Sequence, residues 1–368
     1  MLSSLSLFAN ENAHNNEPKM RKIQPWENEL LATTCGKISF HETLNYPWAV
    51  SITLNGRNKL GGVIISPYHI LTAAHPFVNF NGYSFIPCKT NNYRSVTEIL
   101  NRKILFGGQC IRGFTASMTN HPMCKKADVL ENKIRTVIID NNFISENCTK
   151  GHDWAIIEVE EPFIFTDKVR PICLPLKNEK LRNILMIFGW GRKHSFDDGS
   201  PLIHETPMQL DVHCRATWSD NMPTNVNDYI CMKSLNPKYY DTPRTCYVRG
   251  DSGSGMQQIN DNGLAIVVGI TSYGLKGCPP NELARFTRVD CYLNEICHIT
   301  GNCISIPAYA KEGTEHQSHY KRCFSVRRLE DHIGRRLDNS ERLIVSRTKC
   351  SRKEHLLAEV ISHQRRPF

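Results

Sequence analysis

Short apolar runs separated by turn signals occupy the chain between Trp48 and Asp290. The stretch WAVSITLNGRNKLGGVIIS, which begins at Trp48, holds two β-rich runs around Asn55-Gly56, a dipeptide typical of a tight hairpin. Another run, GLAIVVGITSYG at 263–274, is apolar enough for a strand buried on both faces. Further strands are predicted at 102–108, 134–140, 153–160, 184–191 and 284–290, where β-branched and aromatic residues gather.

A single helix is predicted to close this region. In DCYLNEICHIT, at 290–300, Leu293, Ile296 and Cys297 share helical spacing. Many short strands, turns between them and one late helix favour an all-β barrel or sandwich.

The two ends of the chain differ in texture from this middle. Residues 1–37 are polar with one tryptophan and are interpreted as a leader and short pro-segment. Residues 304–368 carry 14 basic and 8 acidic side chains, a net +6 of the chain's +9, and form an appended tail, flexible or partly helical. The rest of the chain is close to neutral. The tail's basic pairs are candidates for binding an acidic glycan or membrane surface, against the simpler interpretation of a solvated or removed extension; no nucleic-acid partner is predicted.

Fifteen cysteines scattered along 368 residues favour disulfides and an oxidising compartment. The apolar stretch Leu2–Ala9 permits a signal peptide but lacks a basic start, so the cysteines carry the prediction of secretion. No stretch approaches the roughly 20 apolar residues of a membrane span. One sequon, Asn147-Cys148-Thr149, fits a glycosylated surface loop.

Three separate motifs contain residues suited to nucleophilic catalysis. RGDSGSG places Ser252 between glycines, and the Gly250 and Ser252 N–H groups are candidates for binding one oxyanion. LTAAH ends in His75. GHDWAIIEVEEP sets Asp153 against apolar residues, where a carboxylate needs a partner. A serine needs a positioned base, and an imidazole needs a carboxylate to fix its tautomer, so these residues form a candidate set in the order His, Asp, Ser.

Together, LTAAH, HDWAIIEVE…PICLP, FGWG, GDSG and GITSYG resemble the chymotrypsin- or trypsin-like serine proteases, from about Pro47 to Thr300. HDWAIIEVE and EICHITGNC resemble a divergent nematode subgroup in particular. The resemblance implies two packed six-stranded antiparallel β-barrels with the active site in the cleft between them. It divides the chain into a pro-segment at 1–37, a protease domain at 38–303 and the tail at 304–368.

The resemblance also implies roles for individual residues. His75 is the general base, Asp153 its orienting carboxylate and Ser252 the nucleophile, with an oxyanion hole from Gly250 and Ser252. Asp251 pairs with the new N-terminus of Ile38 after activation. The residues at or near the substrate pocket are Arg244, Cys246, Ser272, Tyr273, Gly274 and Ala284.

Disulfides follow from the same resemblance: Cys35–Cys173, Cys214–Cys231 and Cys246–Cys278 match family bridges. The family bridge beside the catalytic histidine is absent, because Leu60 and Pro76 stand where its two cysteines would be. Four further cysteines, in the long segment between His75 and Asp153, are expected to form two more bridges of undetermined pairing: Cys88, Cys110, Cys124 and Cys148.

The C-terminal cysteines leave two interpretations open. Cys291, Cys297, His298 and Cys303 fit no standard zinc spacing, so a Cys297–Cys303 bridge is favoured over a metal site. Because fifteen is odd, at least one thiol is unpaired or intermolecular, with Cys291, Cys323 and Cys350 as candidates.

Three departures from the family pattern bear on activity. GDSGSG replaces GDSGGP, so Ser254 adds a side chain where glycine is usual. Two extra residues separate Cys246 from Ser252. The only plausible activation bond is Lys37-Ile38, which would release ISFH without the usual glycines.

The sequence therefore predicts a secreted serine endopeptidase, made as a zymogen, activated by another protease and using neither metal nor organic cofactor. Neither Arg244 nor Cys246 is acidic, so cleavage after Lys or Arg is not expected, and Ala284 favours a small or medium apolar side chain. The alternative is a barrel that binds its partner without cleaving it.

Overall fold

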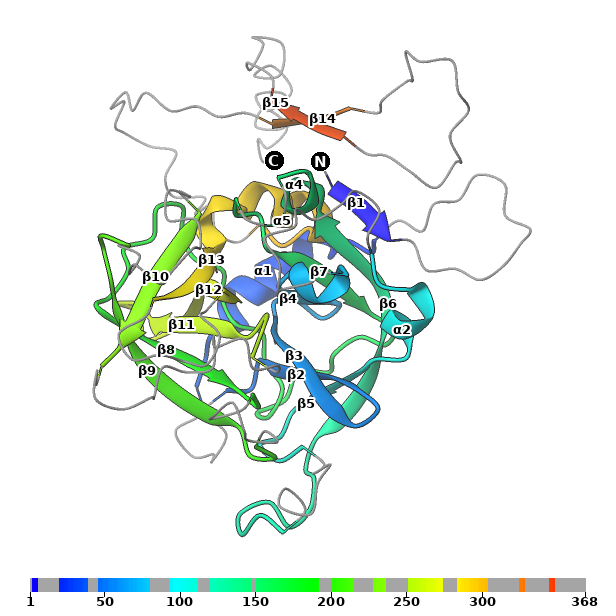
Figure 1. Cartoon of the computed structure of the whole chain (residues 1–368), viewed down its shortest axis with the longest axis vertical. Coiled ribbons are helices and arrows are strands. Elements are labelled where there is room, and N and C mark those ends of the chain that lie inside the picture. The colour runs from blue at the N-terminus through cyan, green and yellow to red at the C-terminus, as the bar shows by residue number, and fades with distance from the viewer. Residues whose placement is uncertain are drawn as a thin grey trace, which may run out of the picture.

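The computed structural model describes residues 2–5, 20–38, 46–79, 93–111, 120–146, 148, 150–191, 200–214, 228–235, 251–273, 283–303, 324–327 and 344–347. Within these residues the chain forms two closed antiparallel β-barrels that lie side by side (Figure 1). Each barrel has six strands, so the predicted all-β, two-barrel fold is confirmed.

The first barrel follows the order β6-β5-β2-β3-β4-β7 and closes where β6 also pairs with β7. The predicted hairpin at Asn55-Gly56 is confirmed: Leu54 pairs with Arg57, and both turn residues have positive φ. An N-terminal strand, β1 (Leu2–Leu5), extends the sheet beside β6. The barrel strands are β2 (Ala49–Leu54), β3 (Arg57–Ile64), β4 (His69–Thr72), β5 (Lys103–Phe106), β6 (Leu130–Asp140) and β7 (Ala155–Val159).

The second barrel follows the order β10-β13-β12-β11-β8-β9 and closes between β9 and β10. All nine residues of its strand β12 are buried, as the apolar run at 263–274 predicted. The strands are β8 (Ile184–Gly189), β9 (His204–Leu210), β10 (Tyr229–Ser234), β11 (Gly255–Ile259), β12 (Ala265–Tyr273) and β13 (Ala284–Arg288).

The predicted closing helix is confirmed as α5 (Leu293–Thr300), which ends at Gly301 in the left-handed conformation. None of the described helices combines the length and apolar character needed to cross a bilayer. The other helical elements among the described residues are α1 (Pro25–Thr34), α2 (Val96–Leu100), α4 (Asn141–Ser145) and the short 3₁₀ turns η1 (His75–Phe77) and η2 (Val289–Cys291).

One cluster of buried side chains spans both barrels, and a second cluster lies mainly within the second barrel. The shared cluster includes Trp48 from the first barrel and Val267 from the second. Trp48 Nε1 donates to Gln257 Oε1 at 2.9 Å, so the buried indole has the partner it requires. This contact fixes the start of β2 against β11, the strand that follows Ser252.

The segment before the barrels, interpreted from sequence as leader and pro-segment, is ordered and docked where the structure describes it. Ile23 N donates to Thr300 O at 2.9 Å, and Asn28 Oδ1 accepts from Cys303 N at 3.0 Å. Leu31 of α1 is 1% exposed. Part of the tail is also described: β14 (Phe324–Arg327) and β15 (Ile344–Arg347) pair as antiparallel strands.

Candidate active site

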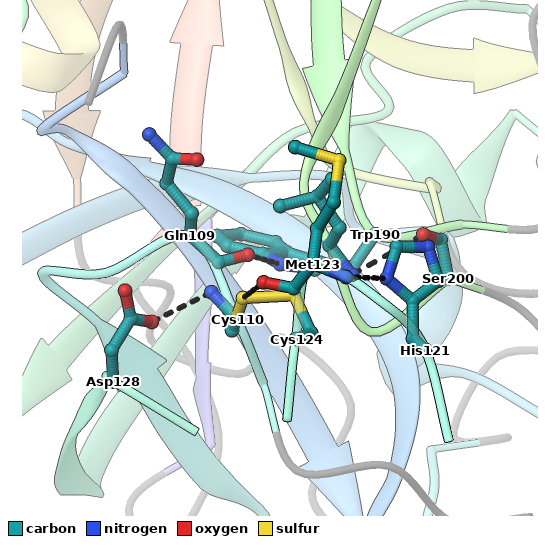
Figure 2. Close-up of a disulfide and its surroundings, with 9 residues drawn as sticks. Gln109, Cys110, His121, Met123, Cys124, Asp128, Trp190 and Ser200 are labelled. Carbon is teal, nitrogen blue, oxygen red and sulfur yellow. Dashed lines mark hydrogen bonds between the residues drawn. A yellow bond between two sulfur atoms is a disulfide. The ribbon is translucent and has the colours of Figure 1, made fainter. Parts of the chain in front are cut away.

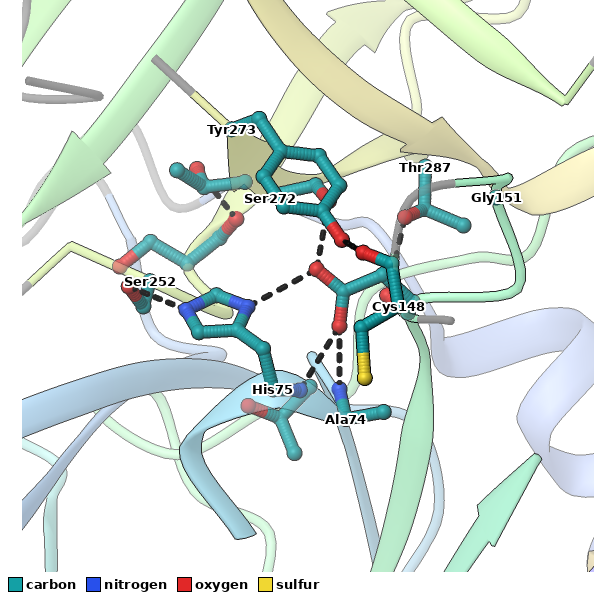
Figure 3. A network of polar contacts seen from close by, with 12 residues as sticks. Ala74, His75, Cys148, Gly151, Ser252, Ser272, Tyr273 and Thr287 are labelled. Carbon is teal, nitrogen blue, oxygen red and sulfur yellow. Dashed lines mark hydrogen bonds and ion pairs between the residues drawn. The ribbon is translucent and has the colours of Figure 1, made fainter. Parts of the chain in front are cut away.

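Three side chains from different parts of the chain meet between the barrels (Figure 3). His75 Nδ1 lies 2.8 Å from Asp153 Oδ2, and His75 Nε2 lies 2.7 Å from Ser252 Oγ. The pairing of β4 with β7 sets Thr72 opposite Ala155 and brings His75 to Asp153, while Ser252 comes from the turn before β11. An imidazole between a carboxylate and a hydroxyl is the arrangement that activates a serine.

Asp153 is fully buried, but it is surrounded by hydrogen-bond donors. Its Oδ1 accepts from Ala74 N at 2.9 Å and His75 N at 2.8 Å, and its Oδ2 accepts from Ser272 Oγ as well as the His75 ring. Burial alone would raise the pKa of Asp153, but the charge of His75 and these hydrogen bonds outweigh it and lower the pKa. The carboxylate therefore stays ionised beside the ring.

The serine loop is tied to both barrels. Ser252 O accepts from Gly61 N of β3 at 2.8 Å, and Gly253 N donates to Thr271 O of β12 at 2.9 Å. Gly253 has φ +80°, and a Cβ there would collide with Thr72 Oγ1, so the turn requires glycine. Gly250, the other residue of the expected oxyanion hole, lies outside the described residues.

The Ser254 departure is accommodated by glycines around it. The side chain is 2% exposed and sits against Gly61 of the first barrel and Gly189 of the second, each of which would clash with it if it carried a Cβ. The backbone of Ser254 keeps a regular turn: its N–H donates to Asp251 O and its carbonyl accepts from Thr271 N, both at 2.9 Å. The extra side chain thus fills a notch instead of displacing the loop.

A second polar network surrounds His152 and Trp154, the two neighbours of Asp153 in the chain. His152 Nδ1 is 2.8 Å from Asp140 Oδ2, which also accepts from Trp154 Nε1 at 2.9 Å. His152 N donates to Asp228 Oδ2 at 2.7 Å, and the Tyr292 hydroxyl donates to the same oxygen. His152 itself has φ +63°, a left-handed conformation that is uncommon outside glycine.

These contacts hold both neighbours of Asp153, and one further bond holds its own backbone, since Thr287 Oγ1 donates to Asp153 O at 2.9 Å. Sequence reasoning misses the network because its members come from separate parts of the chain and match no spacing rule. The one usable signal is the histidine immediately before Asp153 in HDW.

The pocket residues predicted from the sequence are only partly described. Tyr273 stacks beside His75 with ring centroids 6.3 Å apart, and its hydroxyl donates to Cys148 O. Ser272 contacts Asp153 as above, and Ala284 is buried at the start of β13. Arg244, Cys246 and Gly274 lie outside the described residues.

Both residues of the expected activation pair are described. Asp251 is 4% exposed, and its Oδ1 accepts from Gly191 N at 2.7 Å. Ile38 is half-buried and directly follows Lys37, which is exposed. The pairing of the Ile38 amine with Asp251 after cleavage stays a prediction.

Four disulfides link described cysteines. Three have the pairing expected from the sequence, namely Cys35–Cys173, Cys214–Cys231 and Cys297–Cys303. The sulfurs of the last pair are therefore joined in a bridge, and Cys291 is exposed. The expected Cys246–Cys278 bridge lies outside the described residues.

The fourth disulfide belongs to the long segment between His75 and Asp153. Cys110 pairs with Cys124, a choice that the sequence left open (Figure 2). Cys148 is also disulfide-bonded. Cys110 N donates to Asp128 Oδ1 at 2.6 Å, and Gln109 O accepts from Trp190 Nε1 at 2.8 Å. The Cys110–Cys124 disulfide closes a loop within this segment. The hydrogen bond from Trp190, the residue before Gly191, holds the segment against the second barrel.

Comparisons with known proteins agree with this geometry. Residues 38–296 match the family model described as Trypsin. Curated relatives include Transmembrane protease serine 11C of Mus musculus, 21% identical over 294 residues, covering 75% of this chain and 59% of that protein. Others are the Proclotting enzyme of Tachypleus tridentatus (25% identical, 68% and 62% covered) and CLIP domain-containing serine protease B15 of Anopheles gambiae (23%, 68% and 65%).

The chain thus spans 59–65% of the length of these three relatives. The match therefore does not assign the activities of the whole relatives to this chain. The narrower resemblance to a nematode subgroup stays a prediction. The family model, however, covers well over half of the chain and includes His75, Asp153 and Ser252. The chain belongs to the trypsin family of serine proteases.

Proposed function

We propose that this protein is a secreted serine endopeptidase that cleaves peptide bonds through an acyl-enzyme. The observation that carries the proposal is the pair of hydrogen bonds made by the His75 ring, one to Asp153 at 2.8 Å and one to Ser252 Oγ at 2.7 Å. Nucleophile, base and orienting carboxylate stand within hydrogen-bonding reach, which is the geometry that nucleophilic catalysis by serine requires.

The reaction follows from these contacts. As Ser252 Oγ attacks the substrate carbonyl carbon, its proton passes to His75 Nε2, and Asp153 stabilises the resulting imidazolium. The carbonyl oxygen becomes an oxyanion for which Ser252 N and Gly250 N are the proposed donors. When the C–N bond breaks, His75 gives the proton to the leaving amine. Water then repeats the sequence on the ester, which releases the acid and regenerates Ser252.

We further propose that the chain is a zymogen with the pro-segment at 1–37, the protease domain at 38–303 and the tail at 304–368. Exposure of Lys37 supports cleavage of Lys37–Ile38 by another protease. The new Ile38 amine would then pair with Asp251. Glycosylation at Asn147 and binding of acidic surfaces by the tail remain proposals that rest on sequence alone.

For the substrate, we propose a preference for small or medium apolar side chains before the cleaved bond. The absence of an acidic residue at Arg244 and Cys246 argues against Lys or Arg, and buried Ala284 supports a narrow slot. A peptide-library profile dominated by cleavage after Arg or Lys contradicts this part of the proposal without affecting the rest.

The test is labelling by a fluorophosphonate probe, before and after limited proteolysis at Lys37. Activated wild-type protein should be labelled and should cleave a peptide library, while Ser252→Ala should lose labelling and at least about 10³-fold of kcat. Absence of labelling from a folded, cleaved wild type would favour a barrel that only binds. Turnover that survives in Ser252→Ala would show that another group is the nucleophile.

A further inference from the structure

Two arginines hold the backbone directly after His75. The carbonyl oxygen of Pro76 accepts hydrogen bonds from Arg94 Nε at 3.0 Å and from Arg102 Nη2 at 2.9 Å. Glu98 lies between the two guanidinium groups, with its Oε1 3.3 Å from Arg94 Nη1 and 3.0 Å from Arg102 Nη2. Arg94, Glu98 and Arg102 are called the arginine clamp below.

The clamp contains a buried arginine, which distinguishes it from a loose surface ion pair. Arg102 is only 3% exposed, and its guanidinium carbon lies 5.1 Å from the centre of the buried Phe77 ring. Glu98 sits on α2, whose N-cap Ser95 accepts from Glu98 N at 3.2 Å. Burial would raise the pKa of Glu98, but hydrogen bonds and charge from Arg102 and Arg94 lower it, so the carboxylate stays charged.

The clamp acts on the same turn that presents the His75 ring. On the N-terminal side of this turn, Asp153 accepts from Ala74 N and His75 N. On the C-terminal side, Pro76 O receives both clamp donors, and Phe77 O accepts from Arg94 N at 2.9 Å. Charged donors form stronger hydrogen bonds than neutral ones, so the carbonyl of Pro76 is firmly oriented. The turn is therefore fixed at both ends.

The disulfide that the family pattern places at this second end is absent from the chain. Leu60 and Pro76 occupy the positions at which the family pattern places a disulfide beside the histidine. Leu60 is instead fully buried in the first barrel. We propose that the arginine clamp positions His75 in this chain, with charged hydrogen bonds at the place where a covalent bridge is missing. This inference rests on the proposed function, since the clamp positions His75, which is the general base of that reaction.

The experiment compares four forms of the cleaved full-length protein: wild type, Arg102→Met, Arg102→Lys, and Arg102→Met with Leu60→Cys and Pro76→Cys. Methionine keeps the packing on Phe77 but removes the donors. Because a displacement of about 1 Å can reduce a rate 100-fold, kcat of Arg102→Met should fall roughly 10- to 100-fold while KM changes less than about twofold. Lysine should recover part of kcat, and the added bridge most of it.

The matched control is Arg135→Gln, which removes another arginine–carboxylate contact of the first barrel, that of Arg135 on β6 with buried Glu158 on β7. It should lower the urea midpoint without lowering kcat. If Arg102→Met stays folded and keeps kcat within about twofold, or if the added bridge restores the urea midpoint but not kcat, the clamp is merely structural and the proposal is wrong.

A second measurement separates this proposal from the proposed function. Hydrogen–deuterium exchange of the peptide that contains His75 does not depend on turnover. Faster exchange in Arg102→Met, reversed when the Leu60→Cys and Pro76→Cys bridge is added, would support the clamp even if Ser252 were never labelled. Unchanged exchange in that peptide would overturn it, whatever the activity of the wild type.

Discussion

At the scale of single residues, His152 and Asp153 are two neighbours with opposite environments. Asp153 is an anion surrounded by donors, whereas His152 is a partly buried base surrounded by acids. Burial would lower the pKa of His152, but the hydrogen bond and charge of Asp140, with Asp228 and Glu146, outweigh it and raise the pKa. Glu295 of α5 also faces His152, and the pKa of Glu295 is raised chiefly by burial.

We predict a stability difference between wild type and His152→Asn that depends on pH. Asparagine tolerates the left-handed φ but cannot take a charge. A group whose folded pKa is raised stabilises the fold fully below its unfolded pKa, about 6.5, and loses that contribution as pH rises through the folded value. In urea unfolding, the free energy of unfolding of the variant should be lower than that of the wild type by roughly 1.5–3 kcal/mol at about pH 5.5.

The same difference should shrink toward about pH 9. The control is His213→Asn, an exposed histidine, which should change stability little at either pH. A difference that stays constant or widens with rising pH contradicts the assignment of a charged His152.

The triad could be predicted from sequence, because each member sits in a short motif whose chemistry is explicit. The supporting residues could not. Asp140 ends one strand and Asp228 precedes another, and only barrel closure brings them to His152. Likewise, the arginine clamp depends on a five-residue helix too short to leave a periodic pattern.

At the scale of elements, α1 shows why the strands were predicted and this helix was not. Its only buried residue is Leu31, while Trp26 and Leu30 are 64% and 51% exposed. A helix that buries one side chain has no apolar stripe, so its sequence looks like a polar leader. Its start is instead set by Pro25 and by Gln24 N, which donates to Glu27 Oε2 at 2.6 Å.

We predict that Leu31→Ala destabilises the full chain by about 2–5 kcal/mol, because it leaves a cavity under α1. Leu30→Ala, on the same helix but facing solvent, is the matched control and should change stability by about 0.5 kcal/mol or less. Urea unfolding of the two variants measures both values. Equal effects would mean that α1 does not dock as described.

At the scale of the whole molecule, the order of five motifs along the chain sufficed to predict two barrels, and the closed sheets confirm them. The sequence did not determine the pairing of the four cysteines in the long segment between His75 and Asp153, since four cysteines allow three connectivities. Apart from the Cys35–Cys173 bridge, it also indicated no contact between the barrels and residues 20–35. These residues dock on Thr300 and Cys303 at the end of α5.

We predict that cleavage at Lys37–Ile38 yields two chains that stay together through Cys35–Cys173. On a denaturing gel without reductant the cleaved protein should run as one species, and with reductant the N-terminal piece should separate. A Cys35→Ser, Cys173→Ser variant should release the piece even without reductant. Separation of the wild-type chains without reductant would contradict this arrangement.

The notch that holds Ser254 has a consequence for how this sequence can change. Ser254 belongs to the second barrel, while Gly61, which leaves room for it, belongs to the first. Any side chain at Gly61 is excluded as long as Ser254 keeps its hydroxymethyl group, so the two halves of the molecule cannot diverge independently at this point. Relatives that carry a larger residue at one of these positions are expected to carry glycine at the other.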